Sequence, residues 1–346
     1  MSEVMTPDAR EGALKQWLLS NGLQVETFLP ASEDASFRRY FRVKLGAACQ
    51  WDGQTFRAST SLIAMDAPPA QEDTHTFVRI ARAWHDAGVA VPQVFACDLG
   101  AGFALLEDLG NVSLLSELDD IPGLADARYA AAGTMLHQLQ AVIDSETLNL
   151  PAYDDAFLRH EMMLFRDWLC QQHLQMTWSD DDQQQWQSVC QLLAANATSQ
   201  PQVCVHRDYH SRNLMVRDDG ALAMIDFQDA MRGPVCYDIV SLLRDCYISW
   251  PIDSVRDWAR RWFDDCPHVA TAADAQRLRW FFLTGVQRQL KAAGIFARLA
   301  LRDGKTGYLK DIPRTLSYIT AIDGDYPELR WLADLIRERC LPGLVR

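Results

Sequence analysis

Three polar residues between Val203 and Asp229 have the types and spacing that metal-assisted phosphate chemistry requires. Asp208 and Asn213 stand five positions apart in the segment HRDYHSRN, and Asp226 follows in IDF after the next apolar run. This is the layout of a kinase catalytic loop followed by its metal-binding aspartate. A fixed carboxylate can accept the proton of a hydroxyl nucleophile, and an amide oxygen with a second carboxylate suits Mg²⁺. The pattern predicts a phosphotransferase.

Short apolar runs on both sides of these residues predict the strands that would position them. Residues 203–205, 214–216 and 221–225 have the pattern of buried strands, and residues 218–220 form the tight turn between the last two. The catalytic loop would then be fixed by a strand at each end. The competing interpretation is that HRD and DF are chance dipeptides in polar turns, where Asp is common. Two motifs in the right order and strand context favour the catalytic interpretation.

The rest of the chain predicts two lobes. A length of 346 residues exceeds the usual size of one hydrophobic core. Up to Gly110 the pattern is rich in short strands, with helices predicted only at residues 10–21 and around residues 77–88. Beyond a hinge at residues 107–110 the pattern becomes mainly helical. We therefore expect an α+β bilobal chain, with residues 1–109 binding nucleotide and residues 110–346 carrying catalysis and substrate binding.

Composition excludes several classes of partner and compartment. The net charge of −13 argues against binding to a nucleic-acid backbone, which draws on clustered Lys and Arg. The first residues lack the basic and apolar parts of a secretory signal, and no run reaches the roughly twenty apolar residues of a membrane span. Nine scattered cysteines without a CxxC pair predict buried thiols in a reducing compartment. We expect a cytoplasmic enzyme acting on a small molecule, with no membrane partner.

The loop and its surroundings resemble the aminoglycoside phosphotransferase branch of the protein-kinase-like fold, which typically has H-G-D-x-H-x-x-N at this place. Residues 65–81, 225–251 and 285–314 narrow the resemblance to the anomeric amino-sugar kinases of bacterial cell-wall recycling, over nearly the whole chain. This resemblance implies the bilobal kinase-like fold and a reaction that uses ATP and Mg²⁺. The acceptor it implies is the C1 hydroxyl of N-acetylmuramate or N-acetylglucosamine.

The resemblance also implies roles for individual residues. Asp208 matches the catalytic base, Asn213 and Asp226 match the metal ligands, and Glu107 to Leu109 match the hinge whose backbone would bind adenine. Candidate contacts to the acceptor follow the metal aspartate: Gln228, Asp229, Arg244 and Asp245. For the last two, a buried ion pair within a core helix is an equally good interpretation.

Two features depart from the kinase pattern. The loop expected over the phosphates, residues 31–39, has no glycine, so backbone N–H groups would approach phosphate beside small residues such as Ser32 and Ser36. The third strand, residues 61–66, has no lysine for the α- and β-phosphates. The candidate replacements are Arg38, Arg39, Arg42 and Lys44, although RRY could also be a solvated strand face.

Two other functions stay open, the first because of the missing lysine. One is a catalytically silent pseudokinase that binds nucleotide or a partner protein, although the base and both metal ligands are present. The other is a kinase for a cationic acceptor such as an aminoglycoside or choline, which the acidic balance would suit. The sequence does not decide the preferred sugar, its anomer or the oligomeric state.

Overall fold

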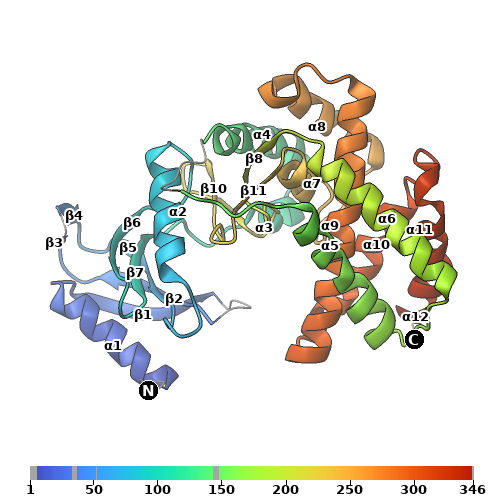
Figure 1. Ribbon diagram of the computed structural model, residues 1–346. Coiled ribbons are helices and arrows are strands. Elements are labelled where there is room, and N and C mark those ends of the chain that lie inside the picture. Colours follow the sequence, from blue (N-terminus) through green and yellow to red (C-terminus); the bar gives the residue numbers. More distant parts are fainter. Residues whose placement is uncertain (1–5, 33–36, 52, 143–147, 345–346) are drawn as a thin grey trace. The chain divides into compact units, whose positions relative to one another are not determined.

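The computed structural model describes residues 6–32, 37–51, 53–142 and 148–344, which divide into two compact units (Figure 1). The N-terminal unit comprises Met1–Val112 and Met215–Gln228, and the C-terminal unit comprises Ser113–Leu214 and Asp229–Arg346. The chain thus returns to the N-terminal unit for fourteen residues after the catalytic loop. Asp226 therefore belongs to the N-terminal unit, whereas Asp208 and Asn213 belong to the C-terminal unit.

A five-stranded sheet in the order β1-β2-β5-β7-β6 forms the N-terminal unit, and each neighbouring pair is antiparallel. A small hairpin of β3 and β4 lies beside it. The elements are α1 (Pro7–Ser20), β1 (Val25–Ser32), β2 (Arg39–Leu45), β3 (Cys49–Trp51), β4 (Gln54–Phe56), β5 (Ser61–Asp66), α2 (Thr74–Asp86), β6 (Val94–Asp98) and β7 (Phe103–Glu107).

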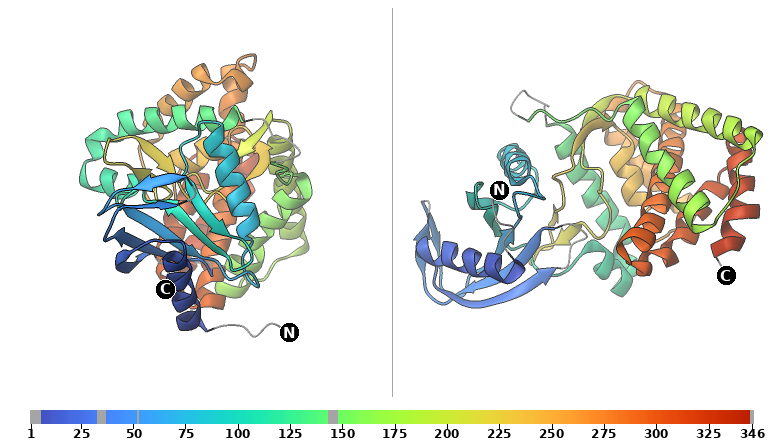
Figure 2. Two further views of the ribbon diagram at one scale, coloured as in Figure 1. Left: turned by 90° about the vertical axis from the view of Figure 1, so that its left-hand side faces the viewer. Right: turned by 60° about the horizontal axis from the view of Figure 1, so that its bottom comes forward.

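Alternation along β2 separates the two faces of this sheet. Phe41, Val43 and Leu45 are buried in one core with Leu14 and Leu18 of α1, and Figure 2 shows α1 lying along that face. Because side chains alternate in a strand, Arg42 projects from the opposite face. Its cross-strand neighbour there is Ile63 of β5. The face that lacks a lysine on β5 therefore carries an arginine on β2.

The C-terminal unit is mainly helical, with one short antiparallel pair, β8 and β11. Its elements are α3 (Leu114–Asp120), α4 (Ala125–Gln140), α5 (Asp155–Leu164), the π-helical segment Phe165–His173, α6 (Asp180–Thr198), β8 (Gln202–Val205), β11 (Met231–Pro234), α7 (Tyr237–Leu243), α8 (Ile252–Asp265), α9 (Asp274–Asp303), α10 (Ile312–Thr320), α11 (Arg330–Leu335), the π-helical segment Ile336–Cys340 and α12 (Leu341–Leu344). Short 3₁₀ turns occupy Pro122–Leu124, Pro267–Val269, Thr306–Asp311 and Pro327–Leu329.

Helix α9 is the central helix of this unit and packs against α5, α6, α7 and α10. A glycine allows its close crossing with α5. A Cβ atom at Gly294 would lie 2.3 Å from the backbone carbonyl carbon of Leu164, closer than side chains tolerate. This crossing fixes the α9 residues that lie next to the catalytic loop.

Most predicted elements are present, including the strands that flank the catalytic loop: β8, β9 (Leu214–Val216) and β10 (Leu222–Met224). The elements not predicted are β1, the β3–β4 hairpin, α3 and β11. Apart from β1, these are three to seven residues long, too short for a periodicity to develop. The helix that begins at Asp155 changes from α- to π-helix at Phe165.

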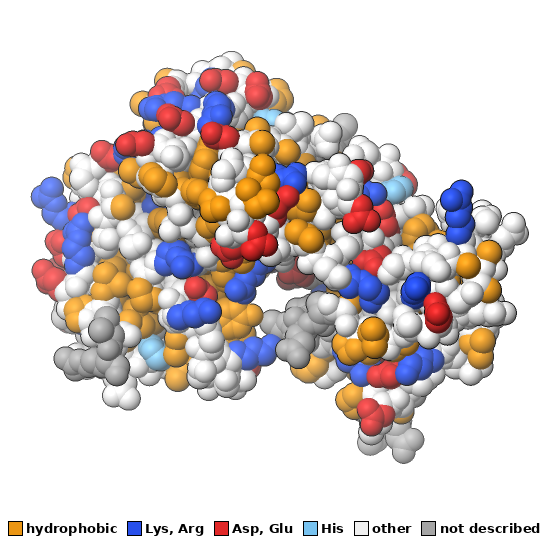
Figure 3. Space-filling view, turned by 180° about the vertical axis from the view of Figure 1, so that it is seen from behind, with side chains coloured by type: hydrophobic (Ala, Val, Ile, Leu, Met, Phe, Trp, Pro, Cys, Tyr) orange, Lys and Arg blue, Asp and Glu red, His pale blue; other side chains and the backbone are white. Residues whose placement is uncertain are grey.

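Surface and cysteine properties agree with the sequence pattern. Acidic and basic side chains are interspersed on the face shown in Figure 3. Within the described part of the chain, no helix is long and apolar enough to cross a membrane. All nine cysteines are free thiols, and seven of them are buried.

Candidate active site

The segment from His206 to Asn213 connects β8 to β9, and Asp238 at the start of α7 holds its first residues. The two carboxylate oxygens of Asp238 accept hydrogen bonds from the backbone N–H groups of His206 (2.7 Å) and Arg207 (3.0 Å). Arg207 has a φ of 76°, in the left-handed region that costs a non-glycine residue energy. The buried Asp238 carboxylate compensates for this strained backbone, which leads directly into Asp208.

A second buried carboxylate holds the middle of the loop. Asp245 accepts hydrogen bonds from the backbone N–H (2.8 Å) and hydroxyl (2.6 Å) of Ser211, and from the N–H of Tyr247. Tyr209 of the loop is fully buried and donates its hydroxyl to the carbonyl of Ala132 in α4. The loop is thus attached to the helices around it at several points along its length.

The two loop residues predicted to act on phosphate are connected to each other. The side-chain amide nitrogen of Asn213 donates to the backbone carbonyl of Asp208 at 3.0 Å, and the N–H of His210 donates to the same carbonyl. This contact orients the Asn213 amide through its nitrogen, whereas a metal ion would use its oxygen. Asp208 and Asn213 therefore keep a fixed relative position.

Several cations surround Asp208. Burial alone would raise the pKa of its carboxyl, but the charges of Lys291, His210, Arg207 and Arg288 outweigh burial and hold this pKa well below its usual range. His210 is itself neutral near pH 7, because burial lowers the pKa of its imidazole. The lasting positive charges are therefore those of the lysine and the two arginines. Asp208 is ionised at neutral pH, as an acceptor of the nucleophile's proton must be.

A buried network, not predicted from the sequence, fixes two of these cations. Glu161 of α5 pairs with Arg207 (2.6 Å) and with Lys291 of α9 (3.4 Å), and it accepts a hydrogen bond from the Tyr153 hydroxyl. Lys291 also donates to the hydroxyl of Tyr237 at 3.2 Å. The available signal in the sequence was a glutamate and a lysine that each interrupt an apolar pattern in the mainly helical part of the chain. Buried charges of this kind need partners, and here the partners adjoin the catalytic loop.

The four residues predicted to contact the acceptor lie in different surroundings. Gln228 donates to the carboxylate of Asp226 at 2.7 Å, and Asp229 is exposed. Arg244 is buried, donates to the carbonyl of Tyr318 and stacks against Phe282 and Tyr318. In the described structure Arg244 and Asp245 do not pair with each other, so the alternative of a buried ion pair between them is wrong. Their role towards an acceptor stays a prediction.

Asp226 follows β10 in the N-terminal unit. Its φ is 67°, so it shares with Arg207 the left-handed backbone that is uncommon outside glycine. The next residue, Phe227, is fully buried and packs against Phe77 and Trp84 of α2. This aromatic anchor fixes the backbone that carries the Asp226 carboxylate.

The predicted hinge is rigidly held at the end of β7. Glu107 pairs with Arg217 at 2.9 Å, and its backbone N–H donates to the carbonyl of Gln93. Arg42 forms a two-pronged contact with Asp108 and also donates to Asn111 and to the carbonyl of Gly110. Leu109 is buried. Arg42 therefore organises the chain directly after β7.

The other two candidate arginines have separate partners. Arg39 pairs with Asp66 (2.6 Å), which is fully buried and also binds Arg10 of α1. Arg38 pairs with Glu72 at 2.9 Å, and the N–H of Phe37 donates to the same carboxylate.

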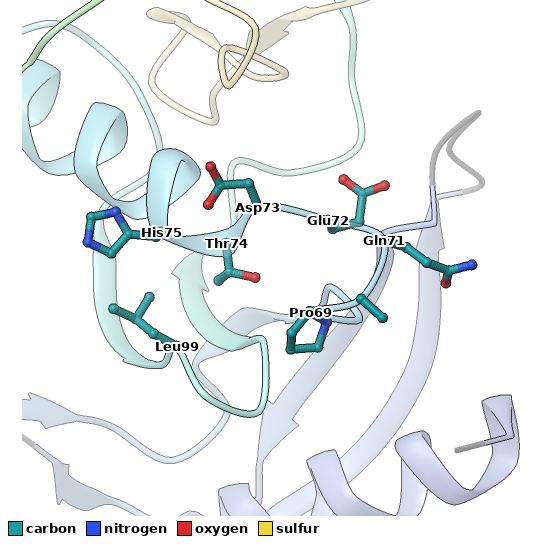
Figure 4. Close-up of a pocket in the computed structure, with 8 residues that line it drawn as sticks. Pro69, Gln71, Glu72, Asp73, Thr74, His75 and Leu99 are labelled. Atoms are coloured by element: carbon teal, nitrogen blue, oxygen red, sulfur yellow. The ribbon is translucent and has the colours of Figure 1, made fainter. Parts of the chain in front are cut away.

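Glu72 lies just before α2, in a pocket lined by residues 69–75 and Leu99 (Figure 4). Asp73 in this pocket caps α2 by accepting from the N–H of Thr76. Of the two small residues predicted near phosphate, Ser32 ends β1 and Ser36 lies outside the described residues.

Comparison with known proteins identifies the family. The model of the phosphotransferase enzyme family matches residues 27–281. The chain belongs to the phosphotransferase enzyme family. This phosphotransferase is 40% identical to the N-acetylmuramate/N-acetylglucosamine kinase of Pseudomonas aeruginosa, over 96% of the chain and 97% of the relative. It is 42% identical to the protein of the same name from Pseudomonas putida, over 89% and 87%.

A solved structure shares the fold of this phosphotransferase at low identity. The ethanolamine kinase of Plasmodium vivax matches with a TM-score of 0.61 and 10% identity, covering 93% of this chain and 95% of that one. The predicted family and kinase-like fold are thus confirmed. At this identity the likeness shows the fold alone.

Proposed function

We propose that the protein is an ATP- and Mg²⁺-dependent cytoplasmic kinase that phosphorylates the anomeric C1 hydroxyl of N-acetylmuramate and N-acetylglucosamine in cell-wall recycling. The observation that carries the proposal is the shared name of relatives that align with almost the whole chain at about 40% identity. The intact loop with Asp208 and Asn213 supports a working kinase rather than a pseudokinase.

Asp208 would align the acceptor hydroxyl and take its proton. The C1 hydroxyl is more acidic than other sugar hydroxyls because the ring oxygen withdraws electrons, so a carboxylate of low pKa is a sufficient acceptor. The low pKa of Asp208 keeps the carboxylate ready in the ionised form. Its loop is held by Asp238 and Asp245, so the alignment costs little further ordering.

Asn213 and Asp226 would hold Mg²⁺, and their donor set of one amide oxygen and one carboxylate fits a hard cation that also binds nucleotide phosphates. Both side chains come from anchored backbone: Asn213 through its contact to Asp208, Asp226 through the buried Phe227. When bound, Mg²⁺ neutralises charge on the phosphates during transfer. The residues themselves orient the donor.

Arg38 is the candidate that we favour for the cation replacing the missing lysine. In kinases the phosphate-binding lysine pairs with a glutamate of the helix that follows the third strand. Arg38 pairs with Glu72, directly before the helix that follows β5, so it has the equivalent type of partner. Arg39 and Arg42 are instead engaged by Asp66 and Asp108.

The experiment that tests the proposal measures ADP release with free sugars and with their methyl glycosides. Methylation removes the C1 hydroxyl and leaves C2 to C6 unchanged. We expect turnover with N-acetylglucosamine or N-acetylmuramate and none with the methyl glycosides. Equal turnover of a methyl glycoside would place the phosphate elsewhere on the ring.

Two further acceptors test the alternatives in the same assay. Activity on kanamycin or choline, with none on either sugar, would assign the protein to the kinases of cationic acceptors. Nucleotide binding without turnover of any acceptor would indicate a pseudokinase.

A further inference from the structure

Helix α9 carries two buried cations one turn apart, Arg288 and Lys291, on the side that adjoins the catalytic loop. Both lower the pKa of Asp208 through their charge. Lys291 has a carboxylate partner in Glu161 and a hydroxyl partner in Tyr237. The two cations therefore differ in whether the protein itself supplies a counter-ion.

Arg288 is only 5% exposed, yet no carboxylate of the described residues lies within ion-pair distance of it. Its one hydrogen bond there is a weak contact of 3.7 Å to the sulfur of Cys246. Cys246 follows Asp245, which holds Ser211 of the catalytic loop. A guanidinium can make five hydrogen bonds in a planar fork, so this buried arginine retains most of its binding capacity.

A second buried residue at the same place has a polar atom without a partner among the described residues. The Nδ1 atom of His210 is buried and makes no hydrogen bond with the described residues. His210 lies between Asp208 and Ser211 in the loop, and the charge of Arg288 contributes to lowering the pKa of its imidazole. Buried polar groups are normally satisfied, so an arginine with one weak hydrogen bond and an imidazole nitrogen with none, both beside the base, indicate a place that a polar ligand completes.

We propose that Arg288 binds the carboxylate of an anionic acceptor sugar, which is the lactyl carboxylate of N-acetylmuramate. The inference rests on the proposed function and adds the residue that distinguishes the two sugars. A carboxylate matches the guanidinium fork and supplies the missing counter-ion. N-acetylglucosamine has no carboxylate, so it gains nothing from this contact and is bound through its hydroxyl and acetamido groups.

Another explanation makes a different prediction. Asp208 and Asp245 both raise the pKa of Arg288, so the arginine could serve only to balance these two charges. Its removal would then weaken catalysis on both sugars alike. If Arg288 binds the lactyl carboxylate, removal affects N-acetylmuramate selectively.

The test compares kcat/KM for three acceptors: N-acetylmuramate, its methyl ester and N-acetylglucosamine. We expect Arg288→Gln to lower kcat/KM for N-acetylmuramate by about 10- to 100-fold more than for the two uncharged acceptors, the usual worth of a charge-assisted contact. Arg288→Lys should recover part of the loss, because it restores charge without the fork. The matched control is Arg302→Gln, at an exposed arginine of the same helix, and it should leave kcat/KM unchanged for all three acceptors.

An experiment on the unaltered protein guards against misfolded variants. With the natural chain, the methyl ester should have at least a tenfold lower kcat/KM than N-acetylmuramate. An equal loss on both sugars in Arg288→Gln, or an equal rate for acid and ester, overturns the inference while leaving the sugar kinase in place. Failure of the natural chain to phosphorylate either sugar would overturn the proposed function itself.

Discussion

Asp238 provides a prediction in which stability and activity change in opposite directions with pH. Burial raises the pKa of its carboxyl from 3.8 to about 7, although the hydrogen bonds that it accepts from two backbone N–H groups lower this pKa in part. Because the pKa is raised in the folded state, the protonated carboxyl favours folding. This contribution is fully present below pH 3.8 and is lost as the pH rises through about 7.

The size of the effect follows from the shift. A difference of about 3 pKa units corresponds to roughly 4 kcal/mol in the free energy of unfolding, of which about 3 kcal/mol falls between pH 5 and pH 8. Asp238→Asn keeps the shape and removes the titration, so the variant should lack this slope. Its stability relative to the natural chain should therefore increase from pH 5 to pH 8.

Urea unfolding followed by tryptophan fluorescence at pH 5, 6, 7 and 8 measures this difference. Asp253→Asn, at an exposed aspartate of α8, is the control for loss of a negative charge. Equal pH slopes for the natural chain and Asp238→Asn would refute the reasoning.

Activity should respond in the other direction. A protonated Asp238 retains one good acceptor oxygen for the two N–H groups of His206 and Arg207, so the loop loses a contact that keeps Arg207 in its left-handed conformation. We expect kcat to fall as the pH decreases below about 7. Asp238→Asn should have a low kcat that does not fall further in this pH range. If kcat of the variant still falls below about pH 7, the decrease belongs to another titrating group.

Three further predictions concern the reacting groups. Asp208→Asn should lower kcat by about two to four powers of ten with ATP binding little changed, and near-normal turnover would remove its assignment as base. Asp226→Ala should abolish Mg²⁺-dependent nucleotide binding in calorimetry, whereas unchanged Mg²⁺ dependence would make this residue structural. Arg38→Ala should raise the KM for ATP or lower kcat at least about tenfold, with exposed Arg57→Ala as control. Identical ATP kinetics in these two variants would leave backbone and metal as the neutralising groups.

The loop and the order of its flanking strands were predictable because their signal is local. Spacing within HRDYHSRN and the apolar runs around it depend on residues a few positions apart, which a single sequence displays directly. The buried face of β2 could also be predicted from the sequence, since Phe41 and Val43 alternate with polar residues. Family resemblance then supplied the roles that spacing alone leaves open.

The groups that hold the loop were not predictable, because their contacts are distant in sequence. Glu161 meets Arg207 across 46 positions, and Asp238 meets His206 across 32. In a sequence each is a single charge in an apolar helical pattern, and the pattern does not say which other charge it meets. The partners of Arg38, Arg39 and Arg42 were undetermined for the same reason, since three neighbouring arginines go to three different carboxylates.

Asp208 and Asp238 have oppositely shifted pKa values, which indicates that the two carboxylates have different roles in the site. Both carboxylates are surrounded by protein at the same loop, but the cations on α9 and in the loop lower the pKa of Asp208, whereas burial and the charge of Asp208 itself raise that of Asp238. Carboxylates whose surroundings separate their pKa values in this way mark different roles. Asp208 remains ionised near neutral pH, so the expected decrease of kcat below about pH 7 reports on Asp238 and on the position of the loop. Comparing the pH profiles of the natural chain and Asp238→Asn thus distinguishes the proton acceptor from the group that positions it.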